Sequence, residues 1–190
     1  MTTRLPFYVV DVFAPRPLTG NPLSLATRWA PGCDWRTRAG SPRPVPCGRR
    51  SPGRCCLSRC SARPAVPAAD RAAVDRAAPD SPRLKSVLRQ ADAEGCYLYS
   101  RDPVDAADAV AYARFFNPTV GIAEDPAAGT AAGPLAARLV ADGRVPDGST
   151  VIIEQGYALG RPSRIAVSVA GQRVRVGGSG LVVAEGALIL

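Results

Sequence analysis

The sequence predicts an α+β fold for the C-terminal half of this 190-residue chain. Six segments between residues 95 and 190 have the alternating, β-branched or aromatic pattern of strands. One segment, residues 130–143, is rich in Ala and Leu at helical spacing, with Leu135, Leu139 and Val140 on one face. We therefore expect a mostly antiparallel sheet wrapped around one central, buried helix.

Strand and turn signals locate the other elements along the chain. Residues 5–12 alternate like a strand, and the Pro- and Gly-containing stretch 14–22 is typical of a loop. Residues 84–91 predict one or two helical turns. We expect Pro134 to lie in the first turn of the central helix, where proline is tolerated. The stretch 169–173 is a hairpin signal between two of the strands.

Residues 27–83 differ in composition from the rest of the chain. They hold twelve Arg and four Asp, a net charge of +8 that equals the net charge of the whole chain. They also hold nine of the nineteen prolines and five of the six cysteines, with few aliphatic residues. We expect irregular chain outside any packed core, with a short helix possible at residues 68–78. G/C-rich coding sequence translated in a shifted frame has this composition, and we interpret the segment in that way.

The cysteines and arginines of this segment raise two other functions, zinc binding and nucleic-acid binding. The cysteines form no C-x-x-C pair and the chain has no histidine, so the spacing does not fit a usual structural zinc site, and we expect no metal. The arginines carry no nucleic-acid-binding motif, so we expect weak, salt-sensitive binding of polyanions and no specific nucleic acid. Cys96, in a predicted strand, is interpreted as a small core residue.

The chemically most specific stretch is AEDPAAGT, residues 123–130. A helix that begins near Gly129 or Thr130 leaves its first N–H groups unpaired, and these groups favour an anion such as a carboxylate. The small side chains let a ligand approach the backbone, and Asp125 can act as an acid or base. From these residues alone, the simpler interpretation is that Glu124 and Asp125 cap the helix.

Four blocks of sequence, taken together, resemble one family. They are FYVVDVFAPRPLTGNPLSL at the start, RFFNPTVGIAEDPAAGTAAGPLAARL in the middle, and EQGYALGRPSRI and VRVGGSGLVVAEGALIL near the end. In this order they resemble the PhzF family, the phenazine-biosynthesis-like isomerases, whose second-domain signature is written around E-D-P-A-T-G-S-A. The resemblance covers residues 5–25 and 84–190.

The resemblance implies a diaminopimelate-epimerase-like fold, with two domains that each wrap a barrel-like sheet around a central helix. It implies that Asp125 is catalytic and that the backbone at Gly129 and Thr130 binds the carboxylate of a small substrate. It implies a cofactor-independent isomerisation, no metal, and a homodimer. We assign residues 1–26 to a remnant of the first domain, 27–83 to the irregular segment and 84–190 to the second domain.

This chain departs from the family pattern in its first domain. The family places a proton-shuttle Glu in an N-x-S-E-T-like stretch and a His in an A-G-H-P-T-like stretch. The chain has no histidine and no glutamate between Asn21 and Leu84. Two hypotheses follow: a PhzF-like isomerase of a biosynthetic pathway, or a binding-only remnant without turnover.

The sequence also gives an expectation for location. The apolar run at the N-terminus is interrupted by Asp11 and lacks a small-residue cleavage site, so we expect no signal peptide. No apolar run approaches the ~18 residues of a membrane span. We therefore expect a cytoplasmic protein without a membrane partner.

Overall fold

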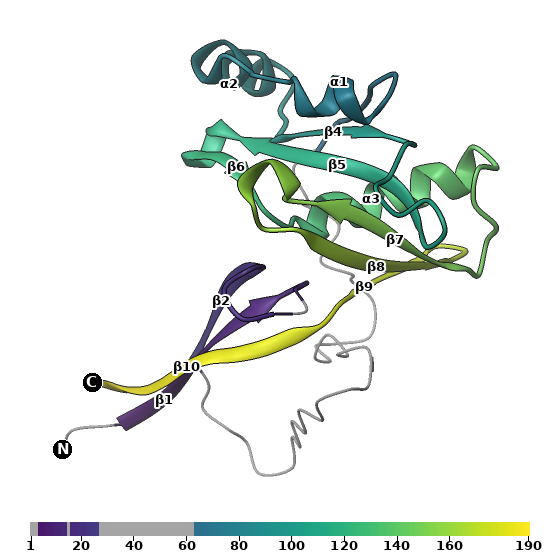
Figure 1. The fold of residues 1–190 in the computed structure, drawn as a ribbon. Coiled ribbons are helices and arrows are strands. Elements are labelled where there is room, and N and C mark those ends of the chain that lie inside the picture. Colours follow the sequence, from purple (N-terminus) through teal and green to yellow (C-terminus); the bar gives the residue numbers. More distant parts are fainter. Residues whose placement is uncertain (1–3, 15, 27–62) are drawn as a thin grey trace.

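The computed structural model describes residues 4–14, 16–26 and 63–190, with backbone alone for residues 25 and 26. It is a mixed α+β structure with two parts (Figure 1). Residues 63–179 form a sheet-and-helix unit, here called the body. The strands β1, β2 and β10 form a separate three-stranded sheet, here called the arm.

The body contains a seven-stranded sheet in the order β3-β4-β5-β7-β8-β9, with β6 paired to β5. Its strands are β3 (Ala65–Pro67), β4 (Cys96–Ser100), β5 (Ala109–Asn117), β6 (Ile122–Asp125), β7 (Thr150–Gln155), β8 (Ser163–Ala170) and β9 (Arg173–Gly177). The β3–β4 and β5–β7 pairs are parallel and the other pairs are antiparallel. Among the described strands the sheet stays open, with β3 and β9 at its two ends.

The helix α3 (Gly129–Ala141) packs into the concave side of this sheet and is the centre of the core, as predicted. Its buried residues include Leu135 at 0% and Leu139 at 2% exposure, packed with side chains from β4, β5, β7 and β8. Pro134 is the sixth residue of α3, so the expectation that it lies in the first turn is wrong. Because proline has no N–H, the carbonyl of Thr130 loses its usual helical partner.

The helices α1 (Arg71–Asp75) and α2 (Ser81–Gln90) precede β4. Side chains alternate along β5: Ala111, Ala113 and Phe115 face α3, while Tyr112 and Arg114 contact α1 on the opposite face. Short 3₁₀ turns occur at Pro118–Val120 and Tyr157–Leu159. In the described part of the chain, no helix has the length and apolar composition required to cross a membrane.

The arm joins the two ends of the described chain. The strand β1 (Arg4–Val12) lies between β2 (Asn21–Ala26) and β10 (Gly180–Ile189), and both pairs are antiparallel. We expected the last strand to belong with residues 84–179, and that expectation is wrong because β10 pairs with β1. The strand β2 was not predicted, because its Asn-Pro start was interpreted as part of a loop.

Phe13 fixes where the arm meets the body. It has a left-handed backbone with φ of 65°, donates its N–H to the Ser179 carbonyl and accepts from the Arg164 N–H. Its ring packs so closely on Gly178 that a Cβ there would overlap the ring. The same ring lies 3.4 Å from where a Cβ of Gly129 would stand. The start of α3 is therefore packed against the N-terminal part of the chain.

Part of the predicted irregular segment is ordered. Residues 65–67 form β3, and the possible helix at 68–78 is confirmed as α1 with Asp70 as its N-cap. Val74 is fully buried, so the prediction that residues 63–82 lie outside any core is wrong. A short helix with one apolar face is enough to bury Val74 over β4 and β5 despite the neighbouring prolines. Residues 27–62, including the predicted shift of frame, lie outside the described residues.

Candidate active site at Asp125

Asp125 ends β6 and is paired with Phe115 of β5. Its Oδ1 accepts hydrogen bonds from the Ala127 N–H at 3.0 Å and from the Asn21 side-chain amide at 2.9 Å. No donor in the described part of the chain bonds its Oδ2. Burial raises the pKa of this half-buried carboxyl, and the Ala127 N–H partly offsets the rise. One carboxylate oxygen is thus held by two donors, and the other has no donor among the described residues.

Asn21 brings the arm to the site. It begins β2, and its side-chain amide donates both to Asp125 and to the Ala127 carbonyl, each at 2.9 Å. The two bonds hold the turn between β6 and α3 against the arm. Asn21 and Asp125 are 104 residues apart in the sequence, so the site depends on tertiary contact between the two parts.

Gln155 holds the same turn from the body side. This fully buried residue ends β7. Its Oε1 accepts from the Tyr97 hydroxyl at 2.9 Å and from the Ala128 N–H at 3.2 Å, and its Nε2 donates to the Asp125 carbonyl at 2.7 Å. Burial, followed by the nearby Asp125 carboxylate, raises the pKa of Tyr97 well above its usual range, so its hydroxyl remains a donor. The backbone on both sides of Asp125 is therefore rigidly placed.

The N-terminus of α3 lies directly after this turn. The N-cap is Ala128, and no side chain caps the helix. The Ala131 and Ala132 N–H groups bond to the Ala128 carbonyl, whereas those of Gly129 and Thr130 have no acceptor among the described residues. Thr130 is exposed and Gly129 half-buried. The capping interpretation of Asp125 is therefore wrong: its carboxylate stabilises the turn before the helix and not the helix end.

Glu124 has a different role from its neighbour. It forms a two-bond ion pair with Arg114, at 2.9 Å and 2.7 Å, and both side chains are about nine-tenths buried. Arg114 also donates to the carbonyls of Val74, Asp75 and Ala77 at the end of α1. Glu124 therefore anchors α1 to the sheet, and it is not free to act at the site.

The sequence predicts Asp125, Gly129 and Thr130 as site residues, and these stay a prediction. It does not single out three residues that hold the turn at Asp125: Asn21, Gln155 and Tyr97. Asn21 was treated only as turn punctuation. Gln155 follows a run of β-branched residues, and a polar side chain at a buried strand position is a usable signal, because it requires partners. Tyr97 is a core aromatic by pattern, and only its hydroxyl bond reveals the link to the site.

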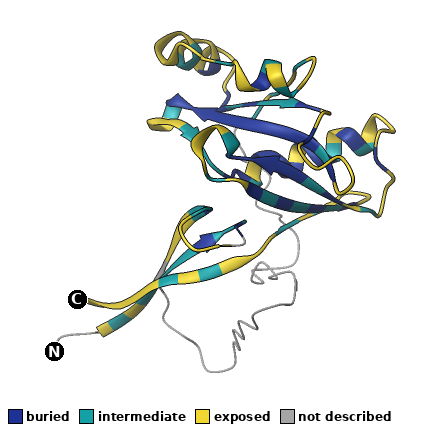
Figure 2. Cartoon of the chain, viewed as in Figure 1, coloured by how far each residue is buried: buried dark blue, intermediate teal, exposed yellow. Residues whose placement is uncertain are grey.

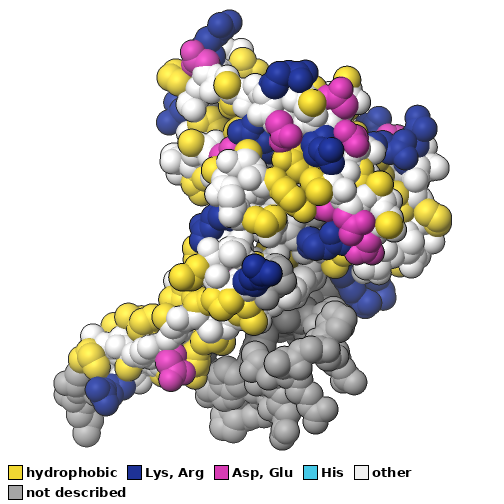
Figure 3. Space-filling view, in the orientation of Figure 1, with side chains coloured by type: hydrophobic (Ala, Val, Ile, Leu, Met, Phe, Trp, Pro, Cys, Tyr) yellow, Lys and Arg dark blue, Asp and Glu magenta, His cyan; other side chains and the backbone are white. Residues whose placement is uncertain are grey.

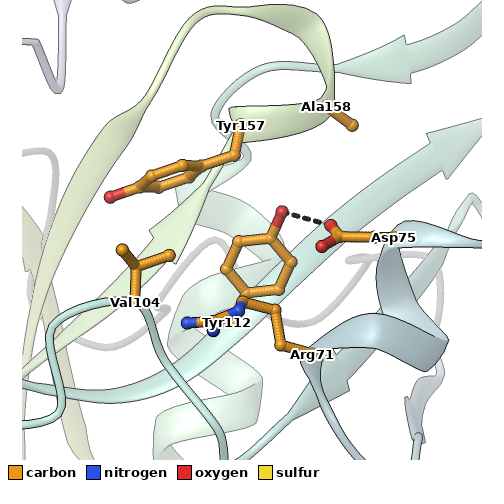
Figure 4. Close-up of a pocket in the computed structure, with 6 residues that line it drawn as sticks. All are labelled: Arg71, Asp75, Val104, Tyr112, Tyr157 and Ala158. Atoms are coloured by element: carbon orange, nitrogen blue, oxygen red, sulfur yellow. Dashed lines mark hydrogen bonds between the residues drawn. The ribbon is translucent and has the colours of Figure 1, made fainter.

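A hollow that does not include Asp125 lies on the opposite face of the sheet, beside α1 (Figure 4). It has a volume of about 370 Å³ and is lined by Arg71, Asp75, Val104, Tyr112, Tyr157 and Ala158. The Tyr112 hydroxyl donates to Asp75 at 2.6 Å, and the Arg71 guanidinium donates to the Pro103 carbonyl. These polar groups already form hydrogen bonds with other groups of the protein, so the hollow is a weaker candidate site than Asp125.

One known family matches most of the chain. The family model for PhzC-PhzF, phenazine biosynthesis-like protein, matches residues 58–186. The chain belongs to this family. The match begins before residue 63, so it includes the strand β3 and the helix α1, which the sequence analysis left outside the resemblance.

Curated relatives of the chain are named as isomerases. An uncharacterized isomerase of Deinococcus radiodurans is 38% identical over 129 residues, which cover 64% of this chain and 41% of the relative. The trans-2,3-dihydro-3-hydroxyanthranilate isomerase of Pseudomonas aeruginosa is 45% identical over 78 residues, 38% of this chain and 28% of the relative. The chain therefore spans less than half the length of these curated relatives.

Solved structures show the shared fold. A PhzF-family protein of Enterococcus faecalis matches with a TM-score of 0.68 at 16% identity, over 99% of this chain and 100% of that chain. A predicted epimerase of Pseudomonas aeruginosa matches with a TM-score of 0.63 at 22% identity, over 98% of this chain and 99% of that chain. The α+β architecture is thus that of PhzF- and epimerase-like proteins.

Proposed function

We propose that the chain carries one wall of a PhzF-like, cofactor-independent isomerase site for a small carboxylate-bearing metabolite. The observation that supports this most directly is the state of Asp125: one oxygen is held by Asn21 and Ala127, and the other has no donor in the described ranges. The relatives' name supplies the reaction class, and the substrate class follows from it by analogy.

The chemistry of the proposed substrate fits these groups. A dihydro-hydroxyanthranilate has a carboxylate, an amine and a hydroxyl on one ring. The free N–H groups of Gly129 and Thr130, with the positive end of the α3 dipole, suit the carboxylate. The Asp125 Oδ2 suits the amine or the hydroxyl. A carboxyl whose pKa is raised by burial can also exchange a proton with a bound substrate.

Isomerisation requires a group that takes a proton from one carbon and returns it to another. The resemblance assigns that task to a glutamate of the first domain, and the chain has neither a Glu between Asn21 and Leu84 nor any His. Among the described residues, Glu124 is held by Arg114. This favours the second candidate function, a binding-only protein that retains the Asp125 wall.

One experiment separates the two functions. The chain is incubated in D₂O with trans-2,3-dihydro-3-hydroxyanthranilate, and the product is analysed by mass spectrometry for deuterium on carbon. An isomerase yields rearranged, deuterated product, and Asp125→Asn abolishes it. The binding-only function predicts no rearrangement in either protein, because the proton shuttle is missing.

Binding is measured separately with 3-hydroxyanthranilate by NMR. Backbone amide signals of residues 128–132 are expected to shift in the wild type, with weak affinity, and to respond differently in Asp125→Asn. The exposed Asp142, which pairs with Arg138 on the far end of α3, supplies the control Asp142→Asn. No shift at residues 128–132 would refute both candidate functions.

We also propose a cytoplasmic homodimer with a role in a biosynthetic pathway. The homodimer is tested by sedimentation velocity over a range of protein concentrations, and a single monomeric species at all concentrations would exclude it. The cellular location is tested by fractionation of cells that express the tagged chain.

A further inference from the structure

A buried carboxylate in the arm has no role in the proposed chemistry so far. Asp11 of β1 is 1% exposed, and both of its oxygens accept from the Gly20 N–H, at 3.1 Å and 3.0 Å. In the described residues, no other group donates to it. Burial of a carboxylate costs free energy, and the hydrogen bonds from the Gly20 N–H offset part of that cost.

The structure that Asp11 maintains is a tight turn that ends at Gly20. A Cβ at Gly20 would overlap the Val12 carbonyl oxygen and would stand 2.7 Å from the Cβ of Ala14, so no other residue fits without moving the backbone. The turn is closed further by the Thr19 hydroxyl, which donates to the Arg16 carbonyl at 2.8 Å. Asp11 therefore ties the end of this turn back onto β1.

The residue that leaves this turn is Asn21, the donor to Asp125. In the sheet Asn21 pairs with Val12 and Pro22 pairs with Asp11, so the position of Gly20 sets where the Asn21 side chain begins. Asn21 then reaches Asp125 and Ala127 at 2.9 Å each. A continuous series of contacts runs from the Asp11 carboxylate through the Gly20 backbone and the Asn21 amide to the Asp125 carboxylate.

We propose that Asp11 is a positioning residue for Asp125: by holding Gly20 it places the Asn21 amide that fixes Oδ1 of Asp125 and leaves Oδ2 toward the ligand. Asp11 touches neither Asp125 nor the ligand position. The functional importance of this series rests on the proposed function, whereas its existence is tested without any ligand.

The test is the pKa of the Asp125 carboxyl, followed by ¹³C NMR in four variants. Asn21→Ala removes the direct donor. Gly20→Ala displaces the turn without changing any charge. Asp11→Asn removes the negative charge and replaces one of the two oxygens that accept from the Gly20 N–H with an NH₂ group. Asp147→Asn is the matched control, because Asp147 also accepts from a glycine N–H, that of Gly171 at 2.9 Å, but it lies far from the site on the β8–β9 side.

A hydrogen-bond donor to the ionised carboxylate lowers the pKa of the carboxyl group, so the loss of that donor raises the pKa. We expect Asn21→Ala and Gly20→Ala to raise the pKa of Asp125 by roughly half to one pH unit, and Asp147→Asn to leave it unchanged. In Asp11→Asn the lost negative charge lowers the pKa of Asp125 and the freed Asn21 raises it. The proposal requires a net rise, and a net fall would show that Asp11 acts only through its charge.

The wild-type chain gives a check that does not depend on variant folding. Deuterium exchange at the Gly20 amide is expected to be slow, because its N–H is held by the buried Asp11 carboxylate. The Asn21 side-chain signals are expected to titrate with the pKa of Asp125. The proposal is overturned by fast exchange at the Gly20 amide. It is also overturned if the Asn21 side-chain signals do not change as Asp125 titrates. Either result leaves the proposed function standing, because ligand shifts at residues 128–132 are measured independently.

Discussion

The body and the arm are both built mainly from strands, but they are stabilised in different ways. In the body, α3 fills one face of the sheet and the buried residues form a continuous core (Figure 2). In the arm, the described residues that are buried are Asp11, Ala14 and Gly20, all near the junction with the body. The arm therefore depends on its strand pairing and on that junction, whereas the body has a core of its own.

The outer part of the arm carries apolar side chains on its surface (Figure 3). Leu23, Val182, Leu188 and Ile189 are each at least 42% exposed. Among residues 4–14, 16–26 and 63–190 no second layer covers this three-stranded sheet, so these residues contribute little apolar burial to its stability. The turn at Asp125 receives one hydrogen-bond donor, Asn21, from the arm, and its other hydrogen-bond partners come from the body. The order of the candidate site therefore depends on the arm as well as on the body.

The largest expected effect is on the core of the body. Leu139→Asp places an unpaired charge where the side chain is 2% exposed, and it should lower the free energy of unfolding by about 4 kcal/mol or more. Urea denaturation monitored by circular dichroism measures this. The control Val87→Asp, on α2 at 61% exposure, should change the midpoint little. Equal effects of the two variants would mean that α3 is not the centre of the core.

The next effect concerns the attachment of α1 to the sheet. Arg114→Met leaves the Glu124 carboxylate buried without its partner and leaves three carbonyls of α1 without their donor. We expect a loss of about 3 kcal/mol in urea denaturation. Arg138→Met, which breaks an exposed pair with Asp142, should leave the urea midpoint nearly unchanged. A tolerated Arg114→Met would show that the other contacts of α1, such as Val74 and the Tyr112–Asp75 hydrogen bond, are enough to hold it.

A smaller and local effect is expected at the junction. Phe13→Ala removes the ring that packs on Gly178 and near Gly129, and it should weaken docking of the arm by about 2 kcal/mol. Hydrogen exchange should accelerate in β1 and β10 while β7 and β8 remain protected. The control Leu18→Ala, at a side chain 71% exposed, should not change exchange. Uniform acceleration through the body would contradict the separation of the two parts.

The smallest expected effect is the pH dependence that Asp125 contributes. Burial raises the pKa of its carboxyl in the folded chain, so the protonated form is favoured there. Its stabilisation is complete below the unfolded pKa and is lost as the pH rises through the raised pKa. Asp125→Asn should therefore gain stability relative to the wild type from pH 3 to pH 7, by less than about 1 kcal/mol. A difference that shrinks over this range would show that the carboxylate form is the one favoured in the folded state.

The local residue pattern predicted most of the body, because burial of one face of a strand or helix places apolar residues at regular intervals in the sequence. The strand β8 alternates buried and half-buried residues from Ser163 to Val169, and β8 and β9 are joined by the predicted hairpin, with Gly171 at φ 55°. The helix α3 was found from Leu135, Leu139 and Val140. The start of the site was found from small residues before a helix, a pattern that has meaning without knowledge of distant contacts.

Pairing between distant segments leaves no such record. Alternation in β10 shows which side chains share a face but not that the partner is β1 at the other end of the chain. For the same reason, nothing in the residues around Asn21 indicates that its amide meets Asp125. The domain limits at residues 26 and 83, with the first part as a remnant, also stay a prediction.

The sequence by itself determined the family, the helix α3 and most strands of the body, and it indicated Asp125 with Gly129 and Thr130 as a candidate site, because each is expressed in neighbouring residues. Only the tertiary structure decided that Glu124 serves Arg114, that β10 returns to β1, and that Asn21 and Gln155 hold the Asp125 turn from two sides. The physical reason is that hydrogen bonds and ion pairs form between groups that are close in space. The sequence specifies that closeness only through the packing of the whole chain.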